Sequence, residues 1–155
     1  MVERLRRILP GLWAGFLLCV AAVATPAAFA LLERPDAGRV VARILAQEAY
    51  VSLALGLLLL ILERTAARDR AEAGAGSQFS LDFALAAGTL FCTVAGYFGV
   101  QPLMAGARHG EGPLSFGQLH AVSSAFYLVK GLLVLVLAWR AVRPPAPPVS
   151  AATSS

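Results

Sequence analysis

Charged residues are scarce in this sequence. Asp, Glu, Lys and Arg make up 14% of its 155 residues, whereas about 25% is usual in a soluble domain. Hydrophobic residues reach 58%, and the mean hydropathy is +0.71. This composition excludes an ordinary soluble globular domain. The basic residues form short clusters beside apolar stretches and not one basic face with interleaved aromatic residues, so the sequence predicts no nucleic-acid partner.

The motifs of common enzyme classes are also missing. The sequence has no glycine-rich phosphate loop, no Ser/His/Asp arrangement on a soluble scaffold and no carboxylate dyad. Its two cysteines, Cys19 and Cys92, fall near the middle of separate apolar stretches, so no disulfide framework is expected. One histidine and one carboxylate are too few ligands for a specified metal site, and a haem would need a second axial ligand. We therefore expect no enzyme, no metal site and no cofactor.

Four long apolar stretches occupy most of the chain, at 12–32, 40–62, 81–101 and 116–139. Each is close to the ~20 residues that cross ~30 Å of hydrocarbon as a helix. We predict an all-α fold, an integral membrane antiparallel four-helix bundle formed by residues 1–143. The segment 144–155, rich in Pro, Ala and Ser, is expected to be a disordered cytoplasmic tail. The expected partners are the lipid bilayer and further copies of the chain, because four helices enclose little volume.

Basic residues are distributed unevenly between the two sides of the predicted bundle. Eight lie on the side of the termini and four on the other side, and an excess of positive charge favours the cytoplasm. We therefore expect both termini in the cytoplasm and a location in a bacterial inner membrane. The first stretch ends on Ala28-Phe29-Ala30 and imitates a secretory signal, but it is longer than the ~7–15 apolar residues of a signal, so we expect it to be retained.

Polar side chains inside the apolar stretches are the candidate site residues, because polar groups are costly in hydrocarbon. Estimated depths place six of them in one outer-leaflet polar pocket: Glu48, Gln101, His120, Ser123, Ser124 and Tyr127. Glu48 is the strongest functional candidate, since a titrating intramembrane carboxyl is the usual device for proton coupling, and His120 is its predicted partner. The alternative is a static polar contact that fixes helix packing. Lys130 is considered a partner of Asp82 or Glu63.

Two further features concern helix packing. Gly88, Cys92 and Gly96 recur every four residues, which predicts a small-residue face for close helix contact. Pro26 interrupts the first stretch and removes one backbone hydrogen bond, so it either kinks the helix or is accommodated by its neighbours.

Three functional classes remain open at this point. The first is a protein that moves or binds a small solute, an ion or a proton at the polar pocket. The second is a non-transporting membrane scaffold or accessory protein whose polar residues only fix the fold. The third is a haem- or metal-binding membrane protein. The sequence identifies no substrate.

Several short stretches carry a resemblance: FGQLHAVSSAFY at 116–127, EAY at 48–50, QP at 101–102 and PAAF at 26–29. They resemble the bacterial four-helix membrane domain family of unknown function that is similar to eukaryotic transmembrane protein 205, over about residues 12 to 139. The resemblance implies a membrane protein without an assigned reaction, whose eukaryotic relative is associated with resistance to platinum drugs through sulfur-bearing helix positions. This sequence has no cysteine pair one turn apart, and a two-thiol site would require Cys19 and Cys92 to approach each other.

Overall fold

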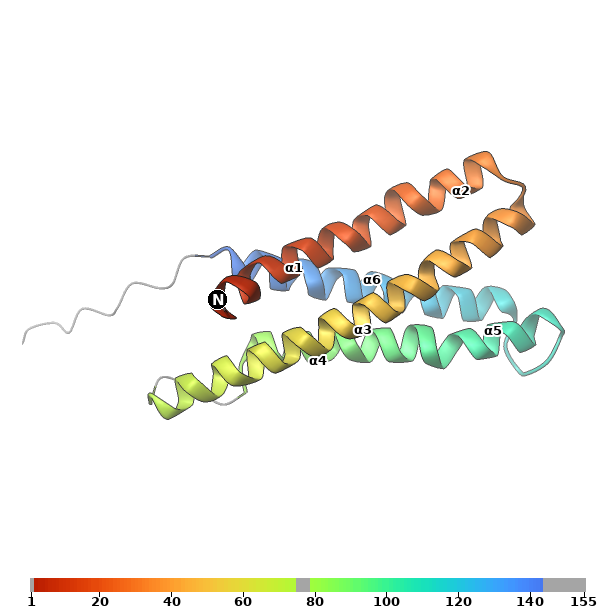
Figure 1. The fold of residues 1–155 in the computed structure, drawn as a ribbon. Helices are drawn as coiled ribbons and strands as arrows, with labels where there is room; N and C mark the ends of the chain where they lie inside the picture. The colour runs from red at the N-terminus through yellow and green to blue at the C-terminus, as the bar shows by residue number, and fades with distance from the viewer. Residues whose placement is uncertain (1, 75–78, 144–155) are drawn as a thin grey trace, which may run out of the picture.

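The computed structural model describes residues 2–74 and 79–143. Within these residues all regular structure is helical (Figure 1): α1 (Val2–Cys19), η1 (Val20–Ala24), α2 (Thr25–Leu31), α3 (Arg34–Glu72), α4 (Leu81–Thr93), η2 (Val94–Gly99), α5 (Val100–Arg108) and α6 (Phe116–Ala141). The two η segments are short π-helical turns that join their neighbours end to end. The described chain thus forms four long helices, each long and apolar enough to cross a membrane. The predicted all-α fold with four such helices is confirmed.

The helix ends follow local sequence signals. Pro35 and Asp36 stand in the first turn of α3, where proline loses no hydrogen bond and an acidic side chain faces the positive end of the helix dipole. At α6, Ser115 and Gln118 form a capping box in which each side chain bonds the backbone N–H of the other. The second long helix therefore begins at Arg34, six residues before the apolar stretch at 40–62.

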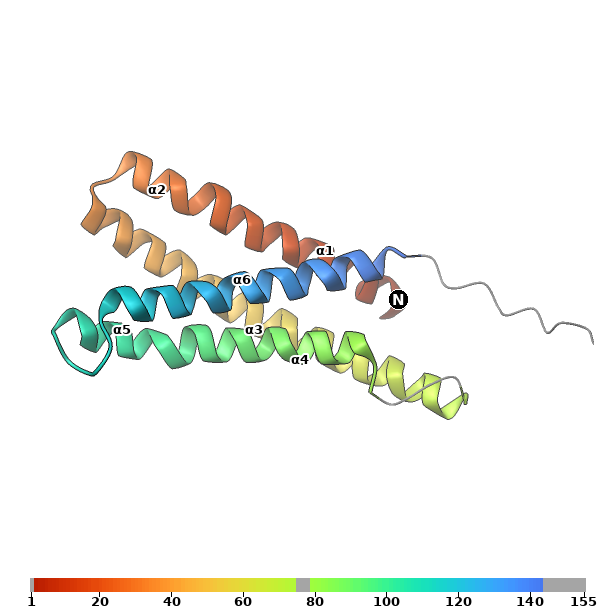
Figure 2. The ribbon, with the colours of Figure 1, turned by 180° about the vertical axis from the view of Figure 1, so that it is seen from behind.

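Four helical segments pack around a common centre. α1 packs against α3 and α6, and α4 packs against the same two helices. In the described chain α1 and α4 share no Cα pair within 8 Å, and neither do α3 and α6. α1 therefore lies diagonally opposite α4, and α3 lies diagonally opposite α6. Figures 1 and 2 show this arrangement from opposite sides.

The main hydrophobic core lies in the half of the molecule that contains the N-terminus. Trp13 of α1, Leu59 of α3 and Val134 of α6 are fully buried there, together with Ala86 of α4. Each of the four helices contributes at least one residue to this cluster. Burial of an aromatic ring and several aliphatic side chains at one level holds the four helices together.

The other half of the molecule divides into two helix pairs. α2 packs against α3, and α5 packs against α6, but within the described residues α2 shares no close Cα pair with α5 or α6, and α3 shares none with α5. Figures 1 and 2 both show the two pairs diverging toward the ends that carry the short loops. A second, smaller hydrophobic cluster of Val100, Met104 and Leu119 lies within the α5–α6 pair alone.

The π-helical turns mark the level at which the pairs begin to diverge. In η1 the amide N–H of Thr25 donates to the carbonyl of Val20, five residues back, and Pro26 follows directly in the first turn of α2. The missing N–H of Pro26 therefore falls where a new α-helical segment begins, so the proline is accommodated within a continuous helix. A π-turn adds a residue to the helix and rotates the side chains beyond it relative to those before.

Candidate functional site

The centre of the bundle contains one ion pair. The Lys130 Nζ on α6 donates to the Glu48 Oε1 on α3 at 2.7 Å. The two side chains are 4% and 3% exposed, respectively. Because α3 and α6 share no close Cα pair, this contact crosses the bundle between opposite helices, and only two long side chains can bridge that separation.

Hydrogen bonds connect the ion pair to the first helix. The Ser52 hydroxyl, one turn after Glu48, donates to the same carboxylate oxygen, and the Trp13 indole N–H donates to the Ser52 oxygen at 2.9 Å. Glu48 and Ser52 lie on the same face of α3 because residues four apart are neighbours on a helix. The resulting chain of contacts runs from α1 through α3 to α6.

The aromatic ring of Tyr127 also contacts the Lys130 ammonium. The Nζ of Lys130 lies 4.8 Å from the centroid of its ring, within the range of a cation–π contact. Its hydroxyl donates to the backbone carbonyl of Leu17 at 2.9 Å, so the ring is fixed in position. In the described part of the chain every buried side-chain nitrogen and oxygen has a hydrogen-bond partner. The site is thus complete without any ligand.

The ion pair lies in the middle of the helices. Glu48 follows the first residue of α3 by 14 residues, and Lys130 follows the first residue of α6 by the same number. At ~1.5 Å per residue, both lie about 21 Å from those helix starts. The pair is therefore near mid-bundle, just inside the level at which the two helix pairs diverge.

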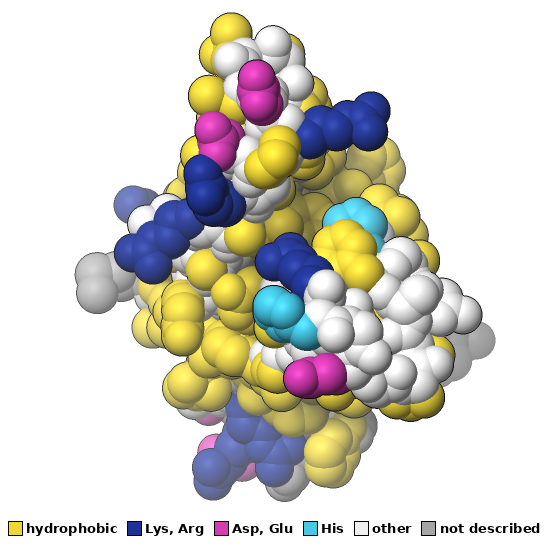
Figure 3. Space-filling view, turned by 90° about the vertical axis from the view of Figure 1, so that its right-hand side faces the viewer, with side chains coloured by type: hydrophobic (Ala, Val, Ile, Leu, Met, Phe, Trp, Pro, Cys, Tyr) yellow, Lys and Arg dark blue, Asp and Glu magenta, His cyan; other side chains and the backbone are white. Residues whose placement is uncertain are grey.

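The structure does not pair Glu48 with His120, contrary to the sequence-based expectation. His120 lies only one turn into α6, is exposed, and stacks on Phe116 with 5.9 Å between ring centroids. Both histidines of the chain are visible on the loop end of the molecule in Figure 3. Glu48 lies 14 residues after the start of α3, whereas His120 lies only four residues after the start of α6. At ~1.5 Å per residue, Glu48 is about 15 Å farther from its helix start than His120 is.

The remaining predicted pocket residues lie at other levels. Gln101 is partly exposed on α5, and Ser124 is half-buried on α6. The Ser123 hydroxyl donates to the backbone carbonyl of Gly96 at 3.0 Å, so it joins α6 to η2. Of the six predicted residues, Tyr127 is the one that the structure places beside the Glu48–Lys130 pair.

The small-residue face predicted from Gly88, Cys92 and Gly96 is confirmed, and it lies on α4 and η2. A Cβ at Gly96 would lie 2.5 Å from the Cβ of Phe126, and one at Gly88 would lie 3.1 Å from a methyl carbon of Leu133. Cys92 between them is buried. The backbone of α4 and η2 therefore approaches that of α6 along this face.

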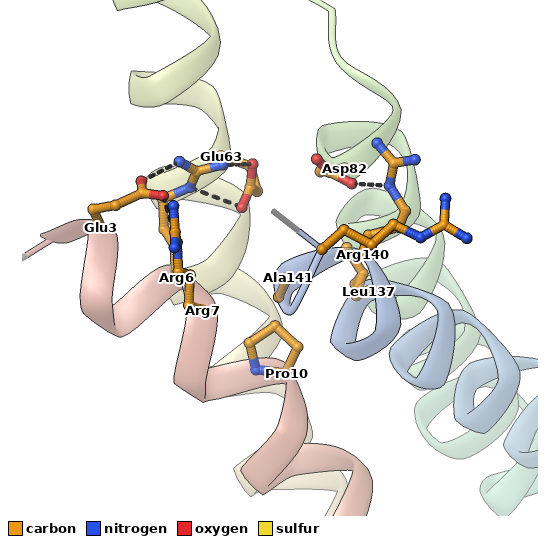
Figure 4. A pocket seen from close by; sticks show the side chains of 10 residues that line it. Glu3, Arg6, Arg7, Pro10, Glu63, Asp82, Leu137, Arg140 and Ala141 are labelled. Atoms are coloured by element: carbon orange, nitrogen blue, oxygen red, sulfur yellow. Dashed lines mark hydrogen bonds and ion pairs between the residues drawn. The ribbon is translucent and has the colours of Figure 1, made fainter. Parts of the chain in front are cut away.

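The expected partners of Lys130 are used elsewhere. Glu63 accepts two hydrogen bonds from the Arg6 guanidinium, at 2.9 and 2.8 Å, and Asp82 accepts one from Arg140. Figure 4 shows both pairs at the end of the bundle that carries the N-terminus. Both carboxylates lie at the end of the bundle that carries the N-terminus, whereas the Lys130 ammonium bonds Glu48 near the centre.

The cysteines do not form a two-thiol site. Cys19 is exposed at the end of α1, whereas Cys92 is buried on α4, and the described parts of these two helices share no Cα pair within 8 Å. Among the described residues no group of three His, Cys, Asp or Glu side chains is placed to hold a metal ion.

These observations define an all-helical protein with four helices able to cross a membrane and one buried ion pair at their centre. The chain belongs to the family described as Domain of unknown function (DUF4149), which matches residues 8–112. The match includes Glu48 and ends before α6, and so before Lys130. Comparison with curated proteins gave no match, and neither did comparison with solved structures.

Sequence reasoning missed three contributors to the site: Trp13, Ser52 and the pairing of Lys130. One signal was available in the sequence. Lys130 is the only lysine of the chain and stands inside an apolar stretch, as Glu48 does, so the two are opposite charges that each need a partner in hydrocarbon. The spacing of Ser52 four residues after Glu48 also places both on one face.

Proposed function

We propose that this protein is a multi-pass protein of the bacterial inner membrane that binds a proton or small ion at the Glu48–Lys130 pair and couples it to movement of a small solute. In this proposal the helices form an antiparallel bundle with both termini in the cytoplasm. The observation that carries the proposal is the position of the pair, buried at mid-bundle and directly below the level at which the helix pairs diverge.

The chemistry of the pair supports proton exchange. One proton moved along the 2.7 Å hydrogen bond converts the ammonium and carboxylate into a neutral amine and carboxylic acid. Burial of two charges away from water is expensive, and the neutral form of the pair avoids that cost. Intramembrane ionisable residues that face the bundle interior are, as a class, associated with ion pathways and proton relays.

The divergence of the helix pairs supports access to the site. The α2–α3 pair and the α5–α6 pair share no close Cα pairs among the described residues, so they can move relative to each other. In this proposal such movement admits water or a solute to the Glu48–Lys130 contact. π-helical turns often occur at functional sites, and here one lies in each of the two diverging pairs. Relative movement of the pairs about this level would change the hydration of the ion pair.

Infrared difference spectroscopy on the purified protein tests proton binding directly. The carbonyl bands of protonated carboxyls appear between alkaline and acidic pH for all nine Asp and Glu side chains of the chain. We expect them to include one band that is missing in Glu48→Gln. Glu111→Gln, a change at an exposed loop carboxylate, is the control and should retain the band. A wild-type spectrum without any Glu48-dependent band would contradict the proposal.

A structural role for the pair is the second candidate function. It is favoured by the complete hydrogen bonding of the site, which leaves no buried polar atom of the described residues without a partner. In that case the protein is a non-transporting membrane scaffold or accessory protein, and the ion pair determines which helices lie opposite each other. An infrared spectrum without a Glu48-dependent carbonyl band would favour this candidate.

We further propose that the protein is not an enzyme and that it assembles with copies of itself, since a single bundle of four helices encloses little volume. The stretch at 116–127 contains the most specific part of its proposed relationship to eukaryotic transmembrane protein 205, and it lies outside the matched residues 8–112. Export of soft metals through paired thiols is not carried over to this chain, because Cys19 and Cys92 lie on opposite helices. A haem or metal site is not proposed at the pair, where among the described residues Glu48 and Lys130 already bond each other.

A further inference from the structure

A second feature, unrelated to the Glu48–Lys130 pair, is a pocket at the end of the bundle that carries the N-terminus (Figure 4). Its volume is about 180 Å³, several times the ~30 Å³ that one water molecule occupies. Residues from α1, α3, α4 and α6 line it, so all four long helices contribute. The pocket is therefore a built feature of the bundle end and not a gap beside one helix.

The lining carries charges of both signs. It contains four arginines and three carboxylates: Arg6, Arg7, Arg140, Arg143, Glu3, Glu63 and Asp82. Arg6 bonds Glu63 and Glu3, Arg7 bonds Glu3, and Arg140 bonds Asp82. Within the described chain Arg143 forms no such ion pair and instead lies 5.8 Å from the centroid of the Trp139 ring. One guanidinium of the lining thus remains available to an anion.

One acceptor is available beside that donor. Asp82 accepts from Arg140 through its Oδ1, while its Oδ2 accepts no hydrogen bond from any of the described residues. Its side chain is 22% exposed, so a ligand can reach it. The pocket therefore offers an unpaired cation and a carboxylate oxygen, which suits a ligand that carries an anion and a cation in one small group.

The position of the pocket indicates where such a ligand comes from. It lies at the end of the apolar helices next to Trp139, which is 65% exposed, and exposed tryptophans of membrane proteins gather at the level of the lipid headgroups. Charged pockets between helix ends on the cytoplasmic side are common headgroup sites.

We infer that this pocket binds the headgroup of a phospholipid that carries one phosphate and one primary ammonium. Arg143 donates to the phosphate oxygens, and Asp82 accepts from the ammonium. Phosphatidylglycerol lacks the ammonium, and the quaternary ammonium of phosphatidylcholine has no N–H to donate, so both fit the pocket less well.

Thermal unfolding of the delipidated, detergent-purified protein tests this inference, with tryptophan fluorescence as the readout. Phosphatidylethanolamine added at a fixed mole fraction should raise Tm by about 5 °C, more than phosphatidylglycerol or phosphatidylcholine does. Arg143→Gln should remove most of that rise, and Asp82→Asn should remove the preference for phosphatidylethanolamine. Arg68→Gln, an exposed arginine outside the pocket lining, should keep the full rise.

Three results would overturn the inference. The first is an equal rise with all three lipids, and the second is an unchanged rise in Arg143→Gln, which remains informative if Asp82→Asn fails to fold. The third is a full rise with soluble glycerophosphoethanolamine alone, which would make the ligand a free phosphodiester and not a lipid. Because Glu48 is untouched in every variant, the outcome is independent of the proton-binding proposal.

Discussion

The Glu48–Lys130 pair shows how two residues that are costly alone become tolerable together. A lone ammonium or carboxylate at this depth would lack both water and a counter-ion. Here the carboxylate accepts from Lys130 and Ser52, and the ammonium also lies against the Tyr127 ring. The energetic consequence is asymmetric, because removing one partner leaves the other buried and uncompensated.

Removing the ammonium alone should therefore destabilise the protein strongly. We expect Lys130→Met to lower the free energy of unfolding by about 3–5 kcal/mol, because it leaves the Glu48 carboxylate buried without its cation. The double variant Glu48→Gln, Lys130→Met should recover most of that loss, since no unpaired charge remains. Reversible unfolding in mixed micelles measures both. Equal losses in the single and double variants would show that the charges are not coupled.

At the level of the helices, close contact between η2 and α6 depends on the absence of a side chain at Gly96. The ring-bearing Phe126 occupies the space that a Cβ would need, and the Ser123 hydroxyl bonds the Gly96 carbonyl next to it. This glycine lies within the π-helical η2, which packs against both α6 and α3. The sequence spacing of Gly88, Cys92 and Gly96 predicted the contact but not the helix that makes it.

Substitution of Gly96 should separate these helices. We expect Gly96→Ala to destabilise the protein by about 1–3 kcal/mol, because the new methyl group overlaps Phe126. Gly131→Ala on α6 is the matched control, since its Cβ would meet nothing within 4 Å. Helix propensity then makes the control neutral or stabilising by up to about 1 kcal/mol. Thermal unfolding in the same detergent compares the two, and a neutral Gly96→Ala would contradict the close contact.

For the whole molecule, the four helices are held at one end and diverge at the other. The held end has the main hydrophobic core and, at its rim, the Arg6–Glu63 and Arg140–Asp82 pairs. The diverging end has two separate helix pairs, and both histidines are exposed there, His109 at the end of α5 and His120 in the second turn of α6. Most of the basic residues belong to the held end, which predicts that this end faces the cytoplasm.

Reporter fusions test that orientation. We expect a fluorescent protein fused after Ser155 to fluoresce and alkaline phosphatase at the same point to be inactive, because both termini are proposed to lie in the cytoplasm. A phosphatase fused within the loop after Arg108 is the positive control and should be active. The reverse pattern would place the charged pocket, and its proposed lipid, on the outer side.

The sequence by itself determined the four helices, because length and apolarity within windows of ~20 residues are local properties that need no knowledge of neighbours. It also identified Glu48, since a carboxylate in an apolar stretch is conspicuous wherever the helix packs. Only the tertiary structure decided the partner of Glu48. That choice depends on where each helix begins and on which helices lie opposite each other. Glu48 and Lys130 each lie 14 residues after the start of their helices, and α3 lies opposite α6, so the two side chains meet. Contacts across a bundle depend on the position of each residue along its helix and on how the helices pack, and no short sequence pattern specifies both.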